Sequence, residues 1–145
     1  MLALSTGSLA LLLGASLSMA AAIAHLACIV LGAPAYRVLG AGERMARAVE
    51  AGRLRPTLVT LAIAGVLVAW AVFALSGSGV VQRLPLTRLA LVAITLAYLG
   101  RAVAFPLLKP RLPENSNTFW WISSGLCGVI GLLHAYGTLS LWSTL

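Results

Sequence analysis

Four long apolar runs constrain this chain more than any other feature of its sequence. Each run has about 19 or more residues, and a helix of about 20 residues crosses a hydrocarbon core of about 30 Å. Backbone polar groups in lipid are satisfied only within a helix or a closed barrel, and these runs lack the apolar–polar alternation of barrel strands. We therefore predict an all-α integral membrane protein. The expected spans cover residues 4–31, 57–75, 86–108 and 119–141.

The composition supports placement in a membrane. Of the 145 residues, 61% are hydrophobic and 9% are charged, and the mean hydropathy is +1.01. A soluble domain carries roughly a quarter charged residues, so a globule of this composition would leave apolar surface in water. No linker or second domain interrupts the chain, and we expect a single four-helix transmembrane bundle over residues 1–145.

The basic residues are distributed unevenly among the connections. Residues 1–36 carry none, the second connection carries Arg83, and the third carries Lys109 and Arg111. Cytoplasmic loops are enriched in Lys and Arg, so the first and third connections are predicted to be cytoplasmic. Both termini would then lie outside, and the expected location is a bacterial inner membrane. The first connection carries Arg37, Arg44, Arg47, Arg53 and Arg55.

The net charge of +7 indicates contacts with lipid headgroups rather than with nucleic acid. The basic residues flank the expected spans, where they meet anionic headgroups. A nucleic-acid interface needs basic side chains that can follow a phosphate backbone, and these lie against the bilayer instead. Membrane lipids are therefore the expected partners, and no nucleic acid is expected.

The first connection is predicted to contain a short interfacial helix. From Gly42 it reads GERMARAVEAGRLRP, which is rich in helix formers up to Gly52. Glu43 and Arg47 form an i, i+4 pair in the favourable order. Such a helix would lie at the cytoplasmic interface or extend from a span.

Ionisable groups within apolar runs mark candidate sites, because lipid makes them costly. We predict a cytoplasmic-side basic layer that suits an anionic amphipathic ligand, such as a lipid headgroup, a fatty acid or a small thiol peptide. Two alternatives remain: Arg101 extends to the interface, and His25 bonds a neighbouring helix. The candidate ligand-binding residues are His25, Tyr98 and Arg101 in the runs and Arg37, Arg44 and Arg47 in the first connection.

The two histidines are not expected to share a ligand. At 1.5 Å rise per residue, His25 and His134 differ in depth by roughly 14 Å, which disfavours a bis-histidine metal or haem site within one subunit. No metal is expected, and His134 is interpreted as structural. Cys28 and Cys127 are interpreted as small apolar fillers.

Small residues recur on faces of the first and fourth runs, where they allow helix backbones to approach closely. The two faces either meet within one chain or form a contact between subunits. We expect a homo-oligomer. The residues concerned are Gly14, Ser18 and Ala22 in the first run and Gly125, Gly128 and Gly131 in the fourth.

The segment from Glu43 to Ala48 reads E-R-M-A-R-A and resembles the E-R-x-x-R-A core of the MAPEG family, the membrane-associated proteins of eicosanoid and glutathione metabolism. Gly100-Arg101 is similar to a Gly-Arg pair in the third helix of that family. The resemblance implies four helices, a large first cytoplasmic loop, a trimer and glutathione as the bound thiol. It also implies anion contacts at Arg44, Arg47 and Arg101.

This chain departs from the family pattern at three places. Ala51 and Leu54 stand where members carry the Asn and Glu that help hold glutathione. Asn115 or a neighbour stands in place of the arginine that activates the thiol. The sequence thus supplies several of the expected arginines without the full glutathione cradle, and whether the protein is an enzyme stays open.

Three function classes follow from these patterns. The first is a MAPEG-like protein, linked to glutathione or lipid, that binds an anionic amphipathic ligand. The second is a small transporter or channel with His25 and Arg101 as pore or ligand groups. The third is an accessory subunit of a larger membrane complex that docks through its small-residue faces.

Overall fold

The computed structural model describes residues 5–145, and its regular elements are all helices, without a strand among those residues. The all-α prediction is confirmed. Residue 4, where the first span was expected to begin, lies outside the described residues. The elements are α1 (Thr6–Leu31), α2 (Ala33–Val38), α3 (Glu43–Glu50), α4 (Arg55–Ser78), α5 (Thr87–Val103), α6 (Phe105–Leu108), the 3₁₀ helix η1 (Lys109–Arg111) and α7 (Asn117–Ser140).

Three helices, α1, α4 and α7, are long and apolar enough to cross a membrane. This is compatible with an integral membrane protein. The span expected over residues 86–108 is instead divided, because α5 and the α6–η1 segment meet at an angle of 64°. Pro106 lies in the first turn of α6; it lacks the N–H that would continue the helix, and its ring would clash with the preceding turn.

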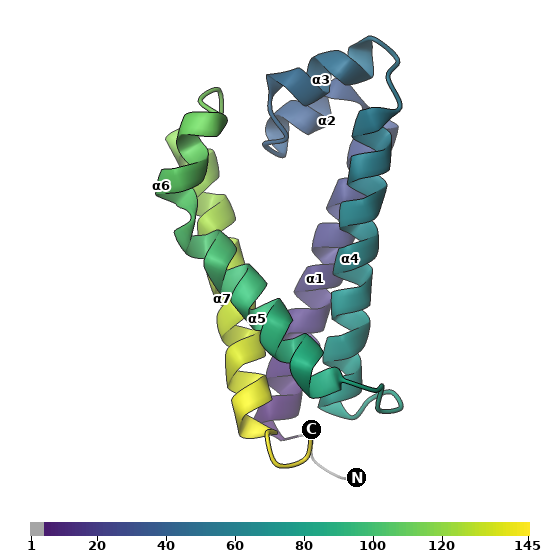
Figure 1. Cartoon of the computed structure of the whole chain (residues 1–145), viewed down its shortest axis with the longest axis vertical. Helices are drawn as coiled ribbons and strands as arrows, with labels where there is room; N and C mark the ends of the chain where they lie inside the picture. Colours follow the sequence, from purple (N-terminus) through teal and green to yellow (C-terminus); the bar gives the residue numbers. More distant parts are fainter. Residues whose placement is uncertain (1–4) are drawn as a thin grey trace.

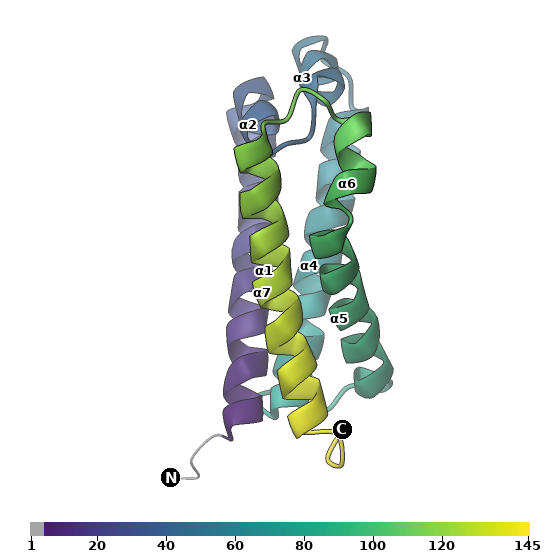
Figure 2. The same cartoon turned by 90° about the vertical axis from the view of Figure 1, so that its left-hand side faces the viewer.

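The long helices form two pairs that diverge like the arms of a V (Figure 1). α1 packs along α4, α5 packs along α7, and the pairs meet mainly through α1 and α7. The start of α1 and the C-terminus lie at the closed end of the V, which we call the terminal end (Figure 1). The α2 and α3 helices lie at the open end, which we call the α3 end (Figures 1 and 2).

Glycines set the close approach of the helices. A methyl group on Gly14 of α1 would lie 2.6 Å from Cε1 of the His134 ring in α7. One on Gly131 of α7 would lie 2.7 Å from a methyl carbon of Leu99 in α5. Part of each small-residue face is thus used within the chain, whereas Gly125 has open space beside it.

The α3 end is capped by a small core of its own. Tyr36 of α2 is buried, and its hydroxyl shares a 2.9 Å hydrogen bond with Thr60 of α4. Ala46 of α3 packs into the same cluster. The short helix predicted in the first connection is present as α3. The α2 helix was not predicted; Pro34 is its second residue and lies in the first turn, where proline is tolerated.

The first and third connections are joined at the α3 end. The backbone N–H of Glu43 donates to the carboxylate of Glu114 at 2.9 Å. The Asn115 amide donates to the Gly40 carbonyl at 3.0 Å. The two basic connections therefore lie together, opposite the terminal end. Their placement on the cytoplasmic side stays a prediction.

The Gly14 contact can be tested by comparing two glycine-to-alanine variants. Gly14→Ala would force the buried His134 ring away, and overpacking of this kind costs about 1–3 kcal/mol. Gly125→Ala adds the same methyl group in open space and gains up to about 1 kcal/mol of helix propensity. We expect a lower midpoint of thermal unfolding in detergent for Gly14→Ala and an unchanged or higher one for Gly125→Ala. Equal midpoints would contradict this packing.

Candidate ligand-binding cleft

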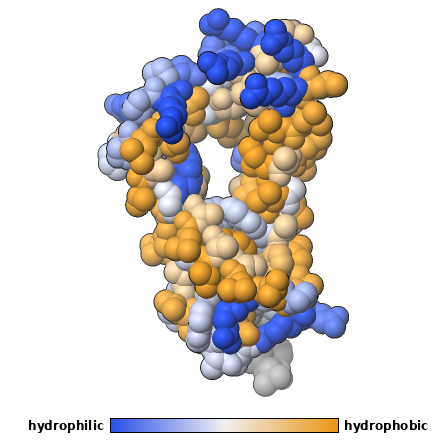
Figure 3. All heavy atoms as spheres, viewed as in Figure 1, coloured by the Kyte–Doolittle hydropathy of each residue, from blue (hydrophilic) through white to orange (hydrophobic). Residues whose placement is uncertain are grey.

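A cleft of about 930 Å³ lies between the two helix pairs. Its walls come from α1 and α4 on one side and α5 and α7 on the other, with Val38 and Leu39 toward the α3 end. Figure 3 shows an opening between the arms of the V. Small-molecule sites usually enclose about 300–1,000 Å³, so the cleft is large enough for a ligand with a sizeable apolar body.

Aliphatic and aromatic side chains make up most of the lining. The lining includes Leu17 of α1, Leu67 and Trp70 of α4, and Ile130 of α7. Within the described part of the chain these side chains form no hydrogen bonds, so an apolar ligand can pack against them without disrupting any. The polar side chains of the lining are His25, Tyr98, Arg101, Ser123 and Cys127.

Arg101 supplies the positive charge of the cleft. It lies in the last turn of α5, and its Nη2 donates a 2.8 Å hydrogen bond to Ser123 Oγ of α7. Its guanidinium carbon lies 5.2 Å from the ring centroid of Trp120, a cation–π contact. Its Nη1 is buried without a hydrogen-bond partner among the described residues. A guanidinium has five N–H donors, so its donor capacity is only partly used.

The chain offers no acidic ion-pair partner for Arg101 among residues 5–145. Its three acidic residues are Glu43, Glu50 and Glu114. Glu43 and Glu50 form ion pairs with Arg37, and Glu114 binds the first turn of α3. A cation without a counter-charge is costly in apolar surroundings. The cleft therefore favours an anion.

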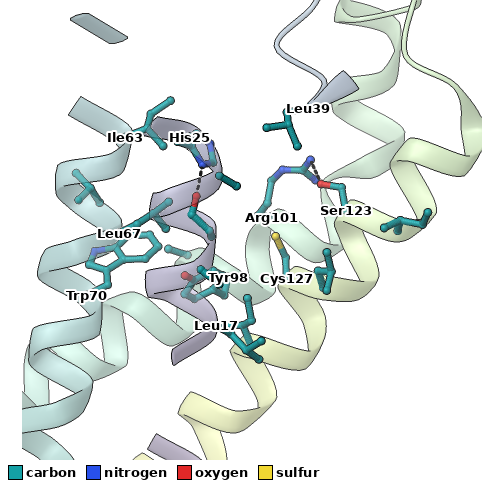
Figure 4. Close-up of a pocket in the computed structure, with 18 of the residues that line it drawn as sticks. Leu17, His25, Leu39, Ile63, Leu67, Trp70, Tyr98, Arg101, Ser123 and Cys127 are labelled. Atoms are coloured by element: carbon teal, nitrogen blue, oxygen red, sulfur yellow. Dashed lines mark hydrogen bonds between the residues drawn. The ribbon is translucent and has the colours of Figure 1, made fainter. Parts of the chain in front are cut away.

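His25 faces Arg101 from the opposite wall, on α1 (Figure 4). Its Nδ1 lies 2.7 Å from the carbonyl oxygen of Ala21. A carbonyl can only accept, so Nδ1 carries the proton and donates it. In the neutral ring Nε2 is then an acceptor. Among residues 5–145, no three His, Cys, Asp or Glu side chains are grouped to hold a metal ion.

Tyr98 closes the cleft toward the terminal end. It is buried, and its hydroxyl shares a 2.8 Å hydrogen bond with Ser18. Its ring packs edge-on against the Trp70 ring, with 5.1 Å between the ring centroids. It is tilted against the His134 ring, with 5.5 Å between the centroids. With its hydroxyl already bonded, Tyr98 shapes the floor of the cleft.

The six residues predicted to bind a ligand lie in two places rather than in one layer. His25, Tyr98 and Arg101 line the cleft, whereas none of the three arginines from the first connection does so. Those three are Arg37, Arg44 and Arg47. Depth along a helix contains no information on which side of the chain each residue faces, so the sequence could not separate the two groups.

Arg37 and Arg47 are engaged in ion pairs at the surface. Arg37 binds Glu43 at 2.8 Å and Glu50 at 2.9 Å, and Arg47 binds Glu43 at 3.2 Å. Hydrogen bonds from Arg37, and then from Arg47, lower the pKa of Glu43 to about 2. The hydrogen bond to Glu43 raises the pKa of Arg37 above its ordinary range.

Sequence reasoning missed three residues that the cleft depends on. Ser123 is the partner of Arg101, Trp120 covers the guanidinium, and Trp70 covers the α4 wall. An indole near the end of an apolar run usually indicates a residue at the membrane interface, so the Trp120 position alone does not reveal its contact with Arg101. Ser123 is a polar residue within an apolar run, but its pairing depends on how α5 and α7 pack.

The two cysteines provide a test of the open cleft. Cys127 lines it, whereas Cys28 is packed in the core at the α3 end and only 3% exposed. In detergent, N-ethylmaleimide is expected to modify Cys127 much faster than Cys28, because only the Cys127 thiol is in reach of a small apolar reagent. Intact mass spectrometry of the Cys127→Ser and Cys28→Ser variants measures each site separately. Equal rates in the folded protein would contradict an open cleft.

No family model matches this chain, and neither a curated protein nor a solved structure proves similar to it. The MAPEG resemblance of the first connection therefore stays a prediction. The function has to be argued from the cleft and its charge.

Proposed function

We propose that the protein binds an anionic amphipathic molecule within the membrane, with the acidic group at Arg101 and the apolar body in the cleft. The observation that carries this proposal is a guanidinium without an acidic partner, set in an apolar cleft of about 930 Å³. An incoming carboxylate or phosphate would use the free donors of Arg101, and such charge-assisted hydrogen bonds are the stronger kind.

The lining favours a ligand with a single acidic head and a long apolar body. A fatty acid or a lipid with one small acidic headgroup has this form. Glutathione fits the lining less well, because its peptide groups would be placed against aliphatic side chains without hydrogen-bond partners. Of the two ligands expected for a MAPEG-like protein, we therefore propose the lipid and not glutathione.

The shape of the cleft supports ligand binding over a continuous pore. The contact of Gly14 with His134 brings α1 and α7 together below the cleft, and Tyr98 covers its floor. The opening between the arms of the V gives a ligand a lateral route from the bilayer (Figure 3).

The charge distribution orients the site. The first and third connections, joined at the α3 end, carry seven of the ten Lys and Arg residues, and such loops face the cytoplasm. We therefore place the Arg101 end of the cleft in the cytoplasmic half of a bacterial inner membrane and both termini outside. A trimer, as in MAPEG proteins, is compatible with the exposed Gly125 face.

Quenching of tryptophan fluorescence by a brominated fatty acid tests the proposal, because Trp70 lines the cleft. In detergent, dibromostearic acid is expected to quench in a saturable way. Arg101→Gln removes hydrogen bonds to a charged group, worth about 1.5–3 kcal/mol, so binding should weaken roughly 10- to 100-fold. Arg83→Gln, which removes an exposed charge at the terminal end, should leave it unchanged.

The methyl ester of the same acid is the matched control ligand. It carries no charge, so the wild-type protein should bind it more weakly than the acid, and Arg101→Gln should affect it little. If acid and ester bind alike, or if Arg101→Gln leaves the acid affinity unchanged, the proposed role of Arg101 is wrong.

A further inference from the structure

A second, shallower depression lies at the α3 end, apart from the cleft. It has a volume of about 400 Å³ and shares no lining residue with the cleft. Arg44 and Arg47 reach it from α3, Arg53 from the following turn, and Arg55 from the first turn of α4. Four of the ten Lys and Arg residues of the chain are thus gathered around one concavity.

The local backbone brings these four arginines together. Gly52 adopts a left-handed conformation, with φ of +66°, which reverses the chain after α3. The N–H of Arg53 donates back to the carbonyl of Ala48 at 2.9 Å and fixes this turn. The arginines of α3 and those that follow it therefore face the same small space.

The depression is strongly positive. Arg47 shares Glu43 with Arg37, while Arg44, Arg53 and Arg55 form no ion pair within residues 5–145. The N-terminal end of α4, a helix of 24 residues, adds its partial positive charge. No acidic side chain is among the described residues that line the depression.

Guanidinium groups point to phosphate as the anion. Their planar forks match phosphate oxygens two at a time, and several forks around one concavity can bind one phosphate from several sides. Arginines spread over a convex surface would not do this. The concavity is therefore suited to a phosphodiester or phosphomonoester group.

The residues beside the arginines indicate that this phosphate belongs to a lipid. Leu54 lies between Arg53 and Arg55 and is 75% exposed. Leu58 and Leu61 follow it at i+4 and i+7, so the three share one face of α4, and they are 63% and 47% exposed. An apolar stripe thus begins where the basic group ends, as the acyl chains of a phospholipid begin below its headgroup.

We propose that Arg44, Arg47, Arg53 and Arg55 bind the phosphate headgroup of one anionic phospholipid, whose acyl chains lie along the exposed leucines of α4. This lipid is distinct from the ligand of the cleft. It holds the turn between α3 and α4 against the leaflet that faces the α3 end.

Native mass spectrometry of the protein released from detergent tests this proposal. Equal amounts of dioleoyl phosphatidylglycerol and dioleoyl phosphatidylcholine are added, and one retained phosphatidylglycerol per chain is expected. In the Arg44→Gln/Arg53→Gln variant its affinity should fall at least about tenfold, because charge-assisted hydrogen bonds are lost. Arg83→Gln/Arg111→Gln removes the same charge from other exposed positions and should retain the lipid.

Two further arms separate this site from other sources of binding. Arg101→Gln should keep the phosphatidylglycerol adduct, which shows that the lipid is not in the cleft. Inorganic phosphate, added up to millimolar concentration, should not displace it. Equal retention of the two lipids, equal loss in both double variants, loss in Arg101→Gln or displacement by phosphate would each overturn the proposal. The comparison of the two lipids uses the wild-type protein, so its result does not depend on whether any variant folds.

Discussion

The close approach of α1 and α7 is the contact on which the rest of this structure depends. Gly14 gives the buried His134 ring the space it needs, and the helices meet there near the terminal end. Had α1 and α7 remained in contact along their full length, side chains would fill the space between the pairs. Because their contact lies at one end, α1 with α4 and α5 with α7 diverge beyond it. The cleft is a consequence of that geometry.

The second constraint is electrostatic. Arg101 projects from α5 into a space lined by leucine, isoleucine and tryptophan, and the chain has no acidic residue there to offset its charge. Ser123 and Trp120 stabilise part of the guanidinium. Neither is an anion. A ligand that brings both an acidic group and an apolar body would complement the charge and the lining together, which is why the two features are interpreted as one site.

The sequence was sufficient for the helices but not for the contacts between them. Long apolar runs predict α1, α4 and α7 because lipid demands satisfied backbone groups, and the Glu43–Arg47 spacing predicts α3. Hydropathy does not distinguish a straight span from one that bends before Pro106. Depth along a helix placed His25 and Arg101 at the same level. Which side each arginine faces, and the pairing of Arg101 with Ser123, depend on helix packing that no short motif encodes.

Photo-crosslinking tests the central claim most directly. A fatty acid with a diazirine near the end of its chain would be bound to the protein in detergent, irradiated, and located by peptide mass spectrometry. We expect label on residues that line the cleft, such as Leu17, Trp70 and Ile130, and we expect this label to be lost when unlabelled fatty acid competes. Label confined to outward-facing residues such as Leu58 and Leu132, without competition, would contradict it.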